Sequence, residues 1–316
     1  MPNQLKKTIA IIGGSGFIGK NFTKYFSDNN FDVVVIDRHF ELKTATPGVI
    51  FTSVDIHHTQ ELTMAVERVD YVIWLVHASV PSTLDESLID DFSLNISPLI
   101  KFLEKAESLP NMKKFIYLSS GGTVYGDVDE NEPIGELHPQ NPISNYGLSK
   151  SIAEKYIKYL TKNTGFESFI LRPSNVFGMF QNLIKPQGII GFAFKSLHDN
   201  KSLDLYDDGR VIRDFVYVMD VANATLKCIQ LDLKSGNTTQ YNVGSNEGLS
   251  IKDVLNKIEK ICNKKLVLNH KTSRTFDCSF SVLDTTKINS DLNWKIETNI
   301  DEGLIKVWEW INTVEK

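Results

Sequence analysis

Short apolar runs alternate with longer amphipathic segments along the first half of the chain. The segment 95–108 carries apolar residues at Ile96, Leu99, Ile100 and Leu103, a period that places them on one face of a helix. The runs between such segments are rich in β-branched residues and are bounded by turn residues, which predicts strands. We expect strands at residues 8–12, 32–36, 71–76, 114–118 and 168–171. This alternation predicts an α/β fold with a Rossmann-type, doubly wound parallel sheet.

The pattern changes after Arg172-Pro173. From there Gly, Asn and Pro are more frequent and the apolar runs are less regular, which indicates longer loops. We therefore predict two domains. Residues 1–173 form the sheet domain, and residues 174–316 form a smaller mixed α/β domain from which some segments return to the first. Trp308 and Trp310 indicate a packed C-terminal helix.

The composition is that of an ordinary globular protein, with 41% hydrophobic and 23% charged residues among 316. A net charge of −5 and a pI near 5.8 argue against nucleic acid as a partner. The apolar run at residues 9–12 breaks at Gly13-Gly14, and the run at 71–76 is far shorter than a membrane span. We expect no membrane association and a cytoplasmic location.

Neither the cysteines nor the histidines form a metal-binding pattern. Cys228, Cys262 and Cys278 lie far apart without CxxC spacing, so we expect packing residues rather than a disulfide framework or a zinc site. His57-His58 has no third ligand at metal spacing. We therefore predict no metal site.

A glycine-rich loop follows the first predicted strand. Gly13, Gly16 and Gly19 have the Gly-x-x-Gly-x-x-Gly spacing, and a helix begins near Phe17. In a strand–turn–helix context, such glycines allow a tight turn, close approach of the backbone to a pyrophosphate, and close packing of helix and strand. The loop therefore predicts a dinucleotide site with the phosphates at the helix N-terminus.

The acid after this loop indicates which dinucleotide binds. Asp37 closes the second predicted strand, about 20 residues after the loop, where a carboxylate accepts both ribose hydroxyls and repels a 2′-phosphate. NAD is therefore the expected cofactor. The neighbouring Arg38 could stack on adenine or bind a 2′-phosphate, which leaves NADP open. Asp55-Ile56 suits an adenine contact, although an Asp after a strand is also a common turn residue.

Tyr146 and Lys150 supply candidate proton chemistry. They are four residues apart, which places both on one face of a helix. A Tyr keeps its proton until about pH 10, and a neighbouring cation lowers its pKa toward the range of a general base. Most Tyr–Lys pairs at this spacing are not catalytic, so the interpretation depends on the glycine loop and Asp37. Together these features indicate redox chemistry at an alcohol carbon.

The chain resembles the extended short-chain dehydrogenase/reductase family, in particular the NAD-dependent nucleotide-sugar epimerases and dehydratases typified by UDP-glucose 4-epimerase. The resemblance spans nearly the whole chain. Its motifs are the glycine loop, Asp37, Asp55-Ile56, residues 119–126 (SSGGTVYG), Tyr146 with Lys150, residues 171–175 (LRPSN), residues 213–220 (RDFVYVMD) and Arg274-x-x-Asp277. Members are commonly homodimers, so the resemblance also implies a homodimer.

The resemblance implies a role for each matching position on the cofactor side. It implies that Tyr146 is the acid/base, and that Lys150 holds the nicotinamide ribose and lowers the pKa of the Tyr. The glycine-loop residues and Asp37 would bind the dinucleotide. Further cofactor positions implied in this way are Phe17, Ile18, Arg38, Asp55, Ile56 and Ser174.

On the substrate side, the resemblance implies that Asn175 and Asp277 contact a nucleotide-diphosphate sugar. Arg213 and Arg274 would clamp the diphosphate, because a guanidinium presents a rigid, permanently charged fork of donors. Arg213 stands beside Asp214 and is also compatible with a surface ion pair.

One position departs from the family pattern. Counting back from Tyr125, the position at which these enzymes usually carry a catalytic Ser or Thr hydroxyl holds Gly121. We expect Ser120 or Thr123 to supply that hydroxyl instead. The Asp-Glu pair that related 4,6-dehydratases place after it is also absent, so dehydration is disfavoured.

Three functions are compatible with these residues. The first is a UDP-hexose type 4-epimerase that acts through a transient 4-keto sugar. The second is an NAD(P)H-dependent reductase of an NDP-4-keto-6-deoxyhexose, which would use the same Tyr146/Lys150 pair. The third is a non-catalytic dinucleotide-binding sensor, against which the intact pair counts. We expect the epimerase.

Overall fold

The main sheet has seven parallel strands. The computed structural model describes residues 6–40, 46–78, 87–128, 132–183, 187–272 and 278–314. The sheet order is β11-β6-β5-β4-β1-β2-β3, and every neighbouring pair is parallel. The order reverses between β1 and β4, so the predicted doubly wound fold is confirmed. The strands are β1 (Thr8–Ile12), β2 (Asp32–Asp37), β3 (Val49–Ser53), β4 (Tyr71–Trp74), β5 (Lys114–Leu118), β6 (Glu167–Pro173) and β11 (Thr238–Val243).

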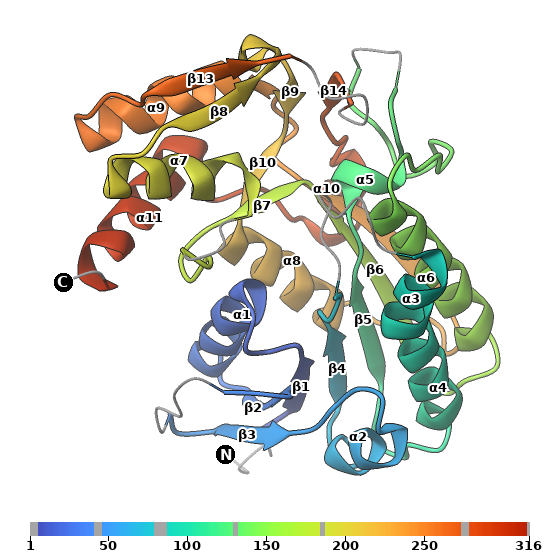
Figure 1. The fold of residues 1–316 in the computed structure, drawn as a ribbon. Helices are drawn as coiled ribbons and strands as arrows, with labels where there is room; N and C mark the ends of the chain where they lie inside the picture. The colour runs from blue at the N-terminus through green and yellow to red at the C-terminus, as the bar shows by residue number, and fades with distance from the viewer. Residues whose placement is uncertain are drawn as a thin grey trace.

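Helices cover both faces of this sheet (Figure 1). One face packs against α1 (Phe17–Asp28), α8 (Val218–Gln230) and α10 (Thr286–Leu292). The other packs against α2 (Thr59–Ala65), α4 (Ser97–Ala106) and α6 (Asn145–Thr161). Strand β1 shows why both faces need cover, since Ile9 and Ile11 belong to one buried cluster while Ala10 and Ile12 belong to the other.

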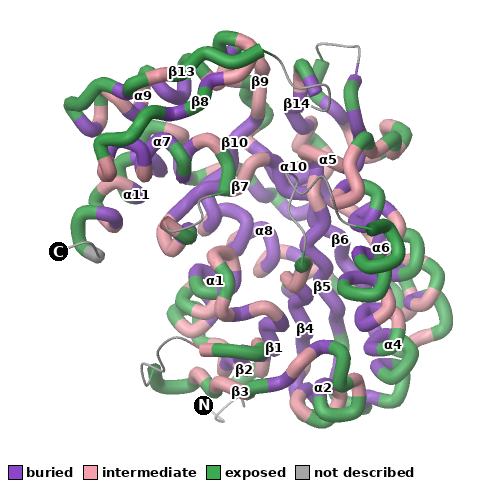
Figure 2. The backbone as a smooth tube through the Cα atoms, viewed as in Figure 1, coloured by how far each residue is buried: buried purple, intermediate pink, exposed green. Residues whose placement is uncertain are grey.

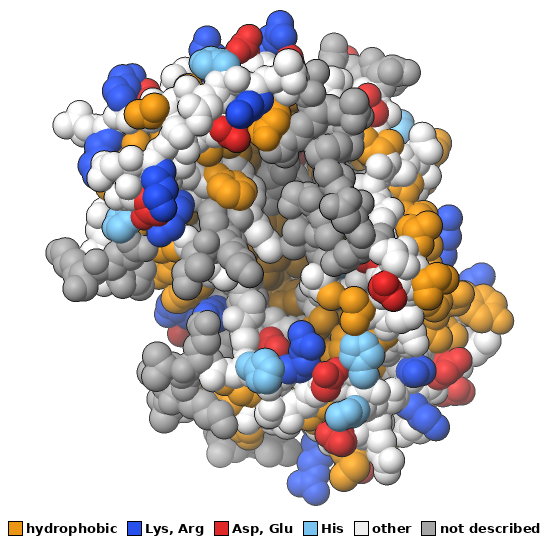
Figure 3. Space-filling view, viewed as in Figure 1, with side chains coloured by type: hydrophobic (Ala, Val, Ile, Leu, Met, Phe, Trp, Pro, Cys, Tyr) orange, Lys and Arg blue, Asp and Glu red, His pale blue; other side chains and the backbone are white. Residues whose placement is uncertain are grey.

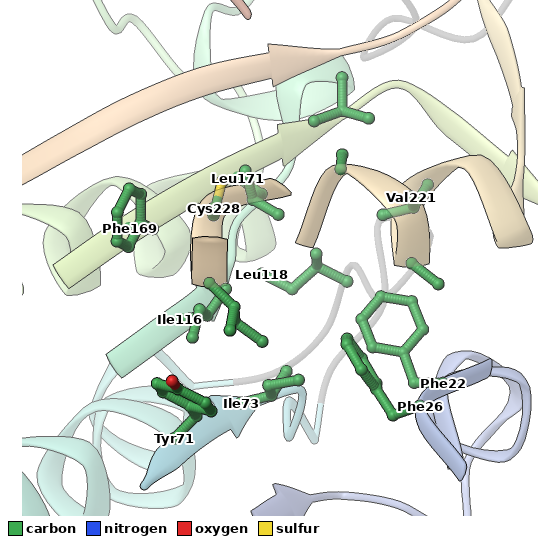
Figure 4. Packing of buried hydrophobic residues seen from close by; sticks show 14 of the residues in the cluster. Phe22, Phe26, Tyr71, Ile73, Ile116, Leu118, Phe169, Leu171, Val221 and Cys228 are labelled. Carbon is green, nitrogen blue, oxygen red and sulfur yellow. The ribbon is translucent and has the colours of Figure 1, made fainter. Parts of the chain in front are cut away.

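The first of these cores is shown in Figure 4. Phe22 and Phe26 of α1 lie near Val221 of α8, and the sheet contributes Ile73 and Leu118 to the same cluster. The two phenylalanine rings meet edge to face, with centroids 5.9 Å apart. This packing holds α1 against the sheet, and the glycine loop immediately precedes that helix.

The predicted elements differ from the observed ones mainly at their ends. Strand β2 extends to Asp37, and β3 ends at Ser53, so Asp55 and Ile56 lie in the turn after it. The helix expected over residues 95–108 is preceded by a π-helical turn, η1 (Phe92–Ile96), and becomes α-helical only from Ser97. Pro98 has no N–H to continue the hydrogen-bond ladder, which accounts for a break there.

The second part of the molecule is a smaller mixed α/β layer (upper part of Figure 1). Its core is formed by apolar side chains of the helices and of three of the strands. Phe194 and Trp308 stack in it with ring planes 13° apart, so the predicted C-terminal helix is confirmed. Its helices are α7 (Gly188–Asp199), α9 (Ile251–Cys262) and α11 (Ile300–Val314), and its paired strands are β7 (Asn175–Phe177) with β10 (Phe215–Tyr217), β8 (Leu203–Tyr206) with β13 (Leu268–Lys271), and β9 (Ile212–Arg213) with β12 (Leu249–Ser250) and β14 (Phe280–Ser281).

The chain crosses between the two parts several times after residue 173. Strand β11 pairs with β6 in the main sheet, and α8 and α10 pack on that sheet. Figure 2 shows the central strands β4, β5 and β6 buried, while β3 and β13 at the sheet edges are partly exposed. The remaining short helical elements are α3 (Leu88–Asp91), α5 (Gly121–Val124) and η2 (Asp207–Gly209).

Among the described residues, no helix is long and apolar enough to cross a membrane. Cys228, Cys262 and Cys278 are all buried, and no disulfide joins them in the described part of the chain. No group of three or more His, Cys, Asp or Glu side chains in the described ranges is placed to hold a metal ion.

Candidate active site

A cleft of about 1050 Å³ lies between the two parts of the molecule. Figure 3 shows the surface hollowed between them. The glycine loop, the residues after β5 and the start of α6 line one side. Strands β7 to β9 and the start of α7 line the other side. The cleft therefore opens at the carboxyl ends of the parallel strands, where α/β sheets bind their ligands.

The glycine loop has no room for side chains at two of its positions. Gly13 has φ +88°, and a Cβ there would lie 2.9 Å from a Val76 methyl group. A Cβ on Gly19 would lie 2.5 Å from the Gly14 Cα. Gly16, the residue before α1, provides no side-chain cap, so the first N–H groups of the helix are left for a ligand. Phe17 and Ile18 also line the cleft.

Asp37 braces this loop from the end of β2. One carboxylate oxygen accepts from the Ser15 N–H at 3.0 Å and the other from the Arg38 N–H at 2.8 Å. Each oxygen keeps a further lone pair, so these bonds are compatible with a ribose contact. Asp37 does not itself line the cleft, and neither does Arg38, which is exposed.

Asp55 and Ile56 act mainly within their own turn. One Asp55 oxygen accepts from the His57 N–H at 2.9 Å, and that bond is the main reason why the pKa of Asp55 lies below its usual value. The same oxygen lies 2.8 Å from His57 Nδ1. Ile56 belongs to the hydrophobic core, and neither residue lines the cleft. The structure therefore favours the turn-residue alternative for Asp55, and an adenine contact stays a prediction.

Helix α6 presents Tyr146 and Lys150 to the cleft. The Ser144 hydroxyl accepts from the Gly147 N–H at 3.1 Å and starts the helix just before the pair. Lys150 is 3% exposed, and its Nζ donates to the Leu118 carbonyl at the end of β5 at 2.8 Å. The same Nζ lies 5.7 Å from the centroid of the Tyr146 ring.

Burial dominates the pKa of both groups. It raises the pKa of Tyr146 to about 12, and the polar side chain of Ser120 acts in the opposite direction. It lowers the pKa of Lys150 to about 7, although nearby carboxylates oppose this change. The expectation that Lys150 brings the pKa of Tyr146 below its usual value is therefore wrong for the protein alone. The cation that should stabilise the phenolate is itself destabilised by the same burial.

The two candidate hydroxyls, those of Ser120 and Thr123, differ in their surroundings. Ser120, the residue before α5, lines the cleft, and its side chain acts to lower the pKa of Tyr146. The Thr123 hydroxyl is buried and lacks a hydrogen-bond partner within the described residues, although Thr123 lines the same cleft. At Gly121, a Cβ would lie 2.5 Å from a Leu283 methyl group and 2.9 Å from the Arg172 carbonyl oxygen. A hydroxyl-bearing side chain therefore does not fit at residue 121.

The opposite wall carries the predicted substrate residues. Asn175 donates from Nδ2 to the Asp214 carbonyl at 2.9 Å, and both Asn175 and Arg213 line the cleft. Asp214 is fully buried and accepts from the Ser245 N–H at 2.8 Å and the Ser245 hydroxyl at 2.6 Å. These bonds turn its carboxylate inward, which argues against a surface ion pair with Arg213. Ser174 lines the cleft as well.

Two predicted substrate residues, Arg274 and Asp277, lie outside the described residues. Gln181 also lines the cleft, although no sequence motif predicts it; it is 6% exposed and has an Oε1 atom without a hydrogen-bond partner in the described ranges. Cys278, expected as a packing residue, is a buried thiol that borders the cleft. No short motif marks either position, because loop conformation brings them there.

The described residues fit NAD. A Cβ on Gly16 would meet only the Gly13 carbonyl oxygen, at 3.5 Å, so the loop is open on the side where a pyrophosphate would approach. The uncapped N–H groups of α1 would hold the phosphates, and Asp37 would accept the adenosine ribose hydroxyls. Lys150 would donate to the nicotinamide ribose.

Comparison with known proteins agrees with this geometry. The model of the NAD dependent epimerase/dehydratase family matches residues 9–244. A Methanocaldococcus jannaschii protein, provisionally named UDP-glucose 4-epimerase, is 30% identical over 308 residues, which cover 96% of this chain and 98% of that protein. The dTDP-4-dehydro-6-deoxyglucose reductase of Escherichia coli is 26% identical over 311 residues, covering 96% of both chains.

Among solved structures, the UDP-glucose 4-epimerase of Thermotoga maritima with UDP-glucose superposes with a TM-score of 0.88. It is 26% identical, and the match covers 98% of this chain and 100% of that one. Since the family model spans well over half of the chain and the full-length relatives share its fold, the chain belongs to the NAD dependent epimerase/dehydratase family, the extended short-chain dehydrogenases/reductases.

Proposed function

We propose that this protein is an NAD-dependent nucleotide-sugar 4-epimerase of the UDP-hexose type. The proposal rests on the placement of Ser120, Tyr146 and Lys150 on one wall of the cleft, with Lys150 one turn after Tyr146 on α6. Across the cleft stand Asn175 and Arg213, which suit a nucleotide diphosphate. A cleft of about 1050 Å³ is large enough for a dinucleotide and a nucleotide-sugar together.

The chain's own residues handle the proton. Tyr146 accepts the proton of the sugar hydroxyl as a phenolate and returns it after the sugar has turned over. Ser120 donates a hydrogen bond to the same reacting oxygen or to the phenolate, which lowers the cost of the negative charge. Bound NAD would supply the hydride acceptor for the sugar carbon and the hydride donor for its return. Because the ammonium form of Lys150 favours the phenolate, Lys150 must hold its proton during the reaction.

The diphosphate would be held while the sugar rotates. Arg213 and the first turn of α7 both line the cleft, and Gln187 before that turn provides no side-chain cap. A guanidinium and uncapped helical N–H groups both favour phosphate oxygens. We assign Arg274 and Asp277 to the same clamp on the family resemblance alone. Retention of the nucleotide end would let the 4-keto sugar present its other face without leaving.

A reductase of an NDP-4-keto-6-deoxyhexose is the second candidate. It is favoured by the 26% identity to the Escherichia coli reductase over almost the whole chain. The exposed Arg38 beside Asp37 also leaves room for NADPH as the reductant. The same Tyr146 would then protonate the keto oxygen once, and the oxidised cofactor would leave.

One set of assays separates the two reactions. Nucleotide released from the purified protein is identified first. The protein is then incubated with UDP-hexoses without added cofactor, and separately with an NDP-4-keto-6-deoxyhexose and NADH or NADPH. We expect interconversion of UDP-hexoses without net oxidation. Stoichiometric loss of reduced cofactor in the second assay, with no interconversion in the first, would replace the epimerase by the reductase.

We further propose that the protein is a homodimer formed through α3 and α6. These helices pack together, and their outer surface keeps large apolar side chains exposed. Ile89 is 73% exposed and Tyr159 67%, and apolar atoms gather on this side in Figure 3. The exposed Asp90 of α3 and Lys155 of α6 are of opposite sign, so a second copy related by two-fold symmetry could pair them.

A further inference from the structure

A buried carboxylate lies one helical turn beyond Lys150, outside the cleft. Glu154 is 1% exposed and follows Lys150 by four residues on α6, on the same face of the helix. Arg172 of β6 donates to it through Nε at 2.9 Å and through a terminal nitrogen at 2.6 Å. Gln140 Nε2 donates to the same carboxylate at 2.6 Å. The carboxylate is therefore fixed in position by charge-assisted and neutral hydrogen bonds.

Glu154 also reaches the residue beside the reacting hydroxyl. The Ser119 hydroxyl donates to Glu154 Oε1 at 2.6 Å, and Ser119 immediately precedes Ser120. The backbone of Ser119 is held by its own N–H, which donates to the Leu171 carbonyl at 2.7 Å. The hydroxyl and the backbone N–H of Ser119 are thus both held by hydrogen bonds. We infer that this restrains the next residue, Ser120, on the wall of the cleft that Tyr146 also lines.

The surroundings of Lys150 contain few charges. The titratable groups that face it are Tyr146 and Glu154 of α6, Tyr117 of β5 and Asp91 of α3. Two of these groups are carboxyl groups, those of Glu154 and Asp91, and both are buried. They oppose the loss of charge that burial imposes on Lys150, Glu154 more strongly than Asp91. Arg172 adds a cation on the far side of Glu154 and weakens its effect.

We propose that Glu154 is a positioning residue that keeps Lys150 charged and Ser120 in place from behind the active site. The ion pair with Arg172 determines how strongly the Glu154 carboxylate stabilises the charged form of Lys150. The inference rests on the proposed roles of Tyr146, Lys150 and Ser120, and it holds for an epimerase and for a reductase alike.

Two substitutions break the same ion pair with opposite electrostatic effects. In Glu154→Gln, Lys150 loses a nearby anion and the Arg172 charge is left uncompensated, so Lys150 gives up its proton at lower pH. In Arg172→Gln, the anion is left uncompensated, so Lys150 keeps its proton to higher pH. We expect the alkaline limb of the pH profile of kcat/KM, measured with NAD present, to move by on the order of one pH unit. It should move to lower pH in Glu154→Gln and to higher pH in Arg172→Gln.

A second measurement does not depend on turnover. Lys150 in the folded protein releases its proton near pH 7, well before the same residue does in the unfolded chain. The unfolded state therefore binds more protons above that pH, and the free energy of unfolding in urea rises with pH from there. The onset of this rise should move down in Glu154→Gln and up in Arg172→Gln. This readout still tests the inference if the wild-type protein shows neither proposed activity.

The controls separate positioning from general destabilisation. Ser151 belongs to the same network, since its hydroxyl donates to Gln140 Oε1 at 2.6 Å, but it carries no charge. Ser151→Ala should lower stability without moving either pH transition. Shifts in the same direction for both charge variants, or no shift in either, would overturn the inference.

For each charge variant we expect a shift of the pH transition in one stated direction. A single variant that folds is therefore sufficient for the test. If neither folds, Glu154→Asp decides the question. It keeps the charge, so the alkaline limb stays in place, but the shorter side chain releases Ser119 and kcat falls by about tenfold. An unchanged kcat in Glu154→Asp would refute the positioning role.

Discussion

The Leu283 side chain occupies the space that a side chain on Gly121 would need. A methyl group of Leu283 lies 2.5 Å from the position of a Cβ on residue 121, and Leu283 is fully buried in a small cluster with Val124 and Tyr125. The hydroxyl that family members usually carry at this position is therefore excluded by packing. We propose that the preceding residue, Ser120, which lines the cleft together with Tyr146, supplies that hydroxyl instead.

Removal of the Ser120 hydroxyl should impair catalysis selectively. Ser120→Ala is expected to lower kcat by about 10²-fold or more, because the hydrogen bond to the reacting oxygen or the phenolate is lost. Thr123→Ala, which removes the other candidate hydroxyl of the cleft wall, should lower kcat by less than about tenfold. Steady-state assays of the two variants decide the assignment, and the reverse order of effects would move the role to Thr123.

Tyr146→Phe tests the proton-handling role directly. The variant keeps the ring and its contact with His77, whose ring centroid lies 4.7 Å away, so the site should keep its shape. We expect kcat to fall by at least about 10²-fold, the usual contribution of a positioned acid/base. Dinucleotide binding, measured by calorimetry, should remain close to that of the wild type. Retention of turnover in this variant would exclude Tyr146 as the acid/base.

The lowered pKa of Lys150 predicts how stability depends on pH. Lys150 in the folded protein is neutral above about pH 7, whereas in the unfolded chain it stays protonated up to its ordinary value of 10.5. Unfolding therefore takes up a proton in this window, and the free energy of unfolding should rise by on the order of 1 kcal/mol per pH unit. Urea unfolding of nucleotide-free protein at several pH values measures the slope.

Lys150→Met is the control for that slope. The substitution removes the titrating group while preserving much of the side-chain volume, so the rise with pH should flatten. A slope that is the same in the wild type and in Lys150→Met would show that other groups cause it.

Arg213 is expected to act on substrate binding. Arg213→Ala should lower kcat/KM for a nucleotide-sugar by about 10- to 100-fold, mainly through KM, because a charge-assisted contact to the diphosphate is lost. Arg210→Ala is a matched control, since Arg210 is 74% exposed, pairs with Asp207 and does not line the cleft. Equal kinetic effects of the two substitutions would argue against a specific diphosphate contact.

The fold and the cofactor side of the site could be predicted because their signals are local. Periodicity predicts strands and helices. The spacing of Gly13, Gly16 and Gly19 reflects close backbone contacts within one strand–turn–helix unit. The four-residue interval from Tyr146 to Lys150 fixes a shared helix face in the same way.

What could not be predicted depends on contacts between distant segments. Leu283 leaves no room for a side chain at Gly121, although more than half of the sequence separates the two residues. Nothing in the sequence near either residue indicates this contact. The pKa of Tyr146 was misjudged because spacing shows a neighbouring cation but not the burial that both groups share. Gln181 reaches the cleft only through the conformation of its loop.

The proposed homodimer can be tested by two substitutions of equally exposed apolar side chains. Tyr159 of α6 is 67% exposed and Met64 of α2 is 68% exposed, but only Tyr159 belongs to the α3–α6 face. A glutamate at the centre of a two-fold interface meets its own copy and is desolvated, which costs several kcal/mol. Tyr159→Glu should therefore be monomeric by light scattering at concentrations at which the wild type and Met64→Glu are dimeric. A monomeric wild type would refute the homodimer. A dimer that persists unchanged in Tyr159→Glu would show that the interface lies outside the α3–α6 face.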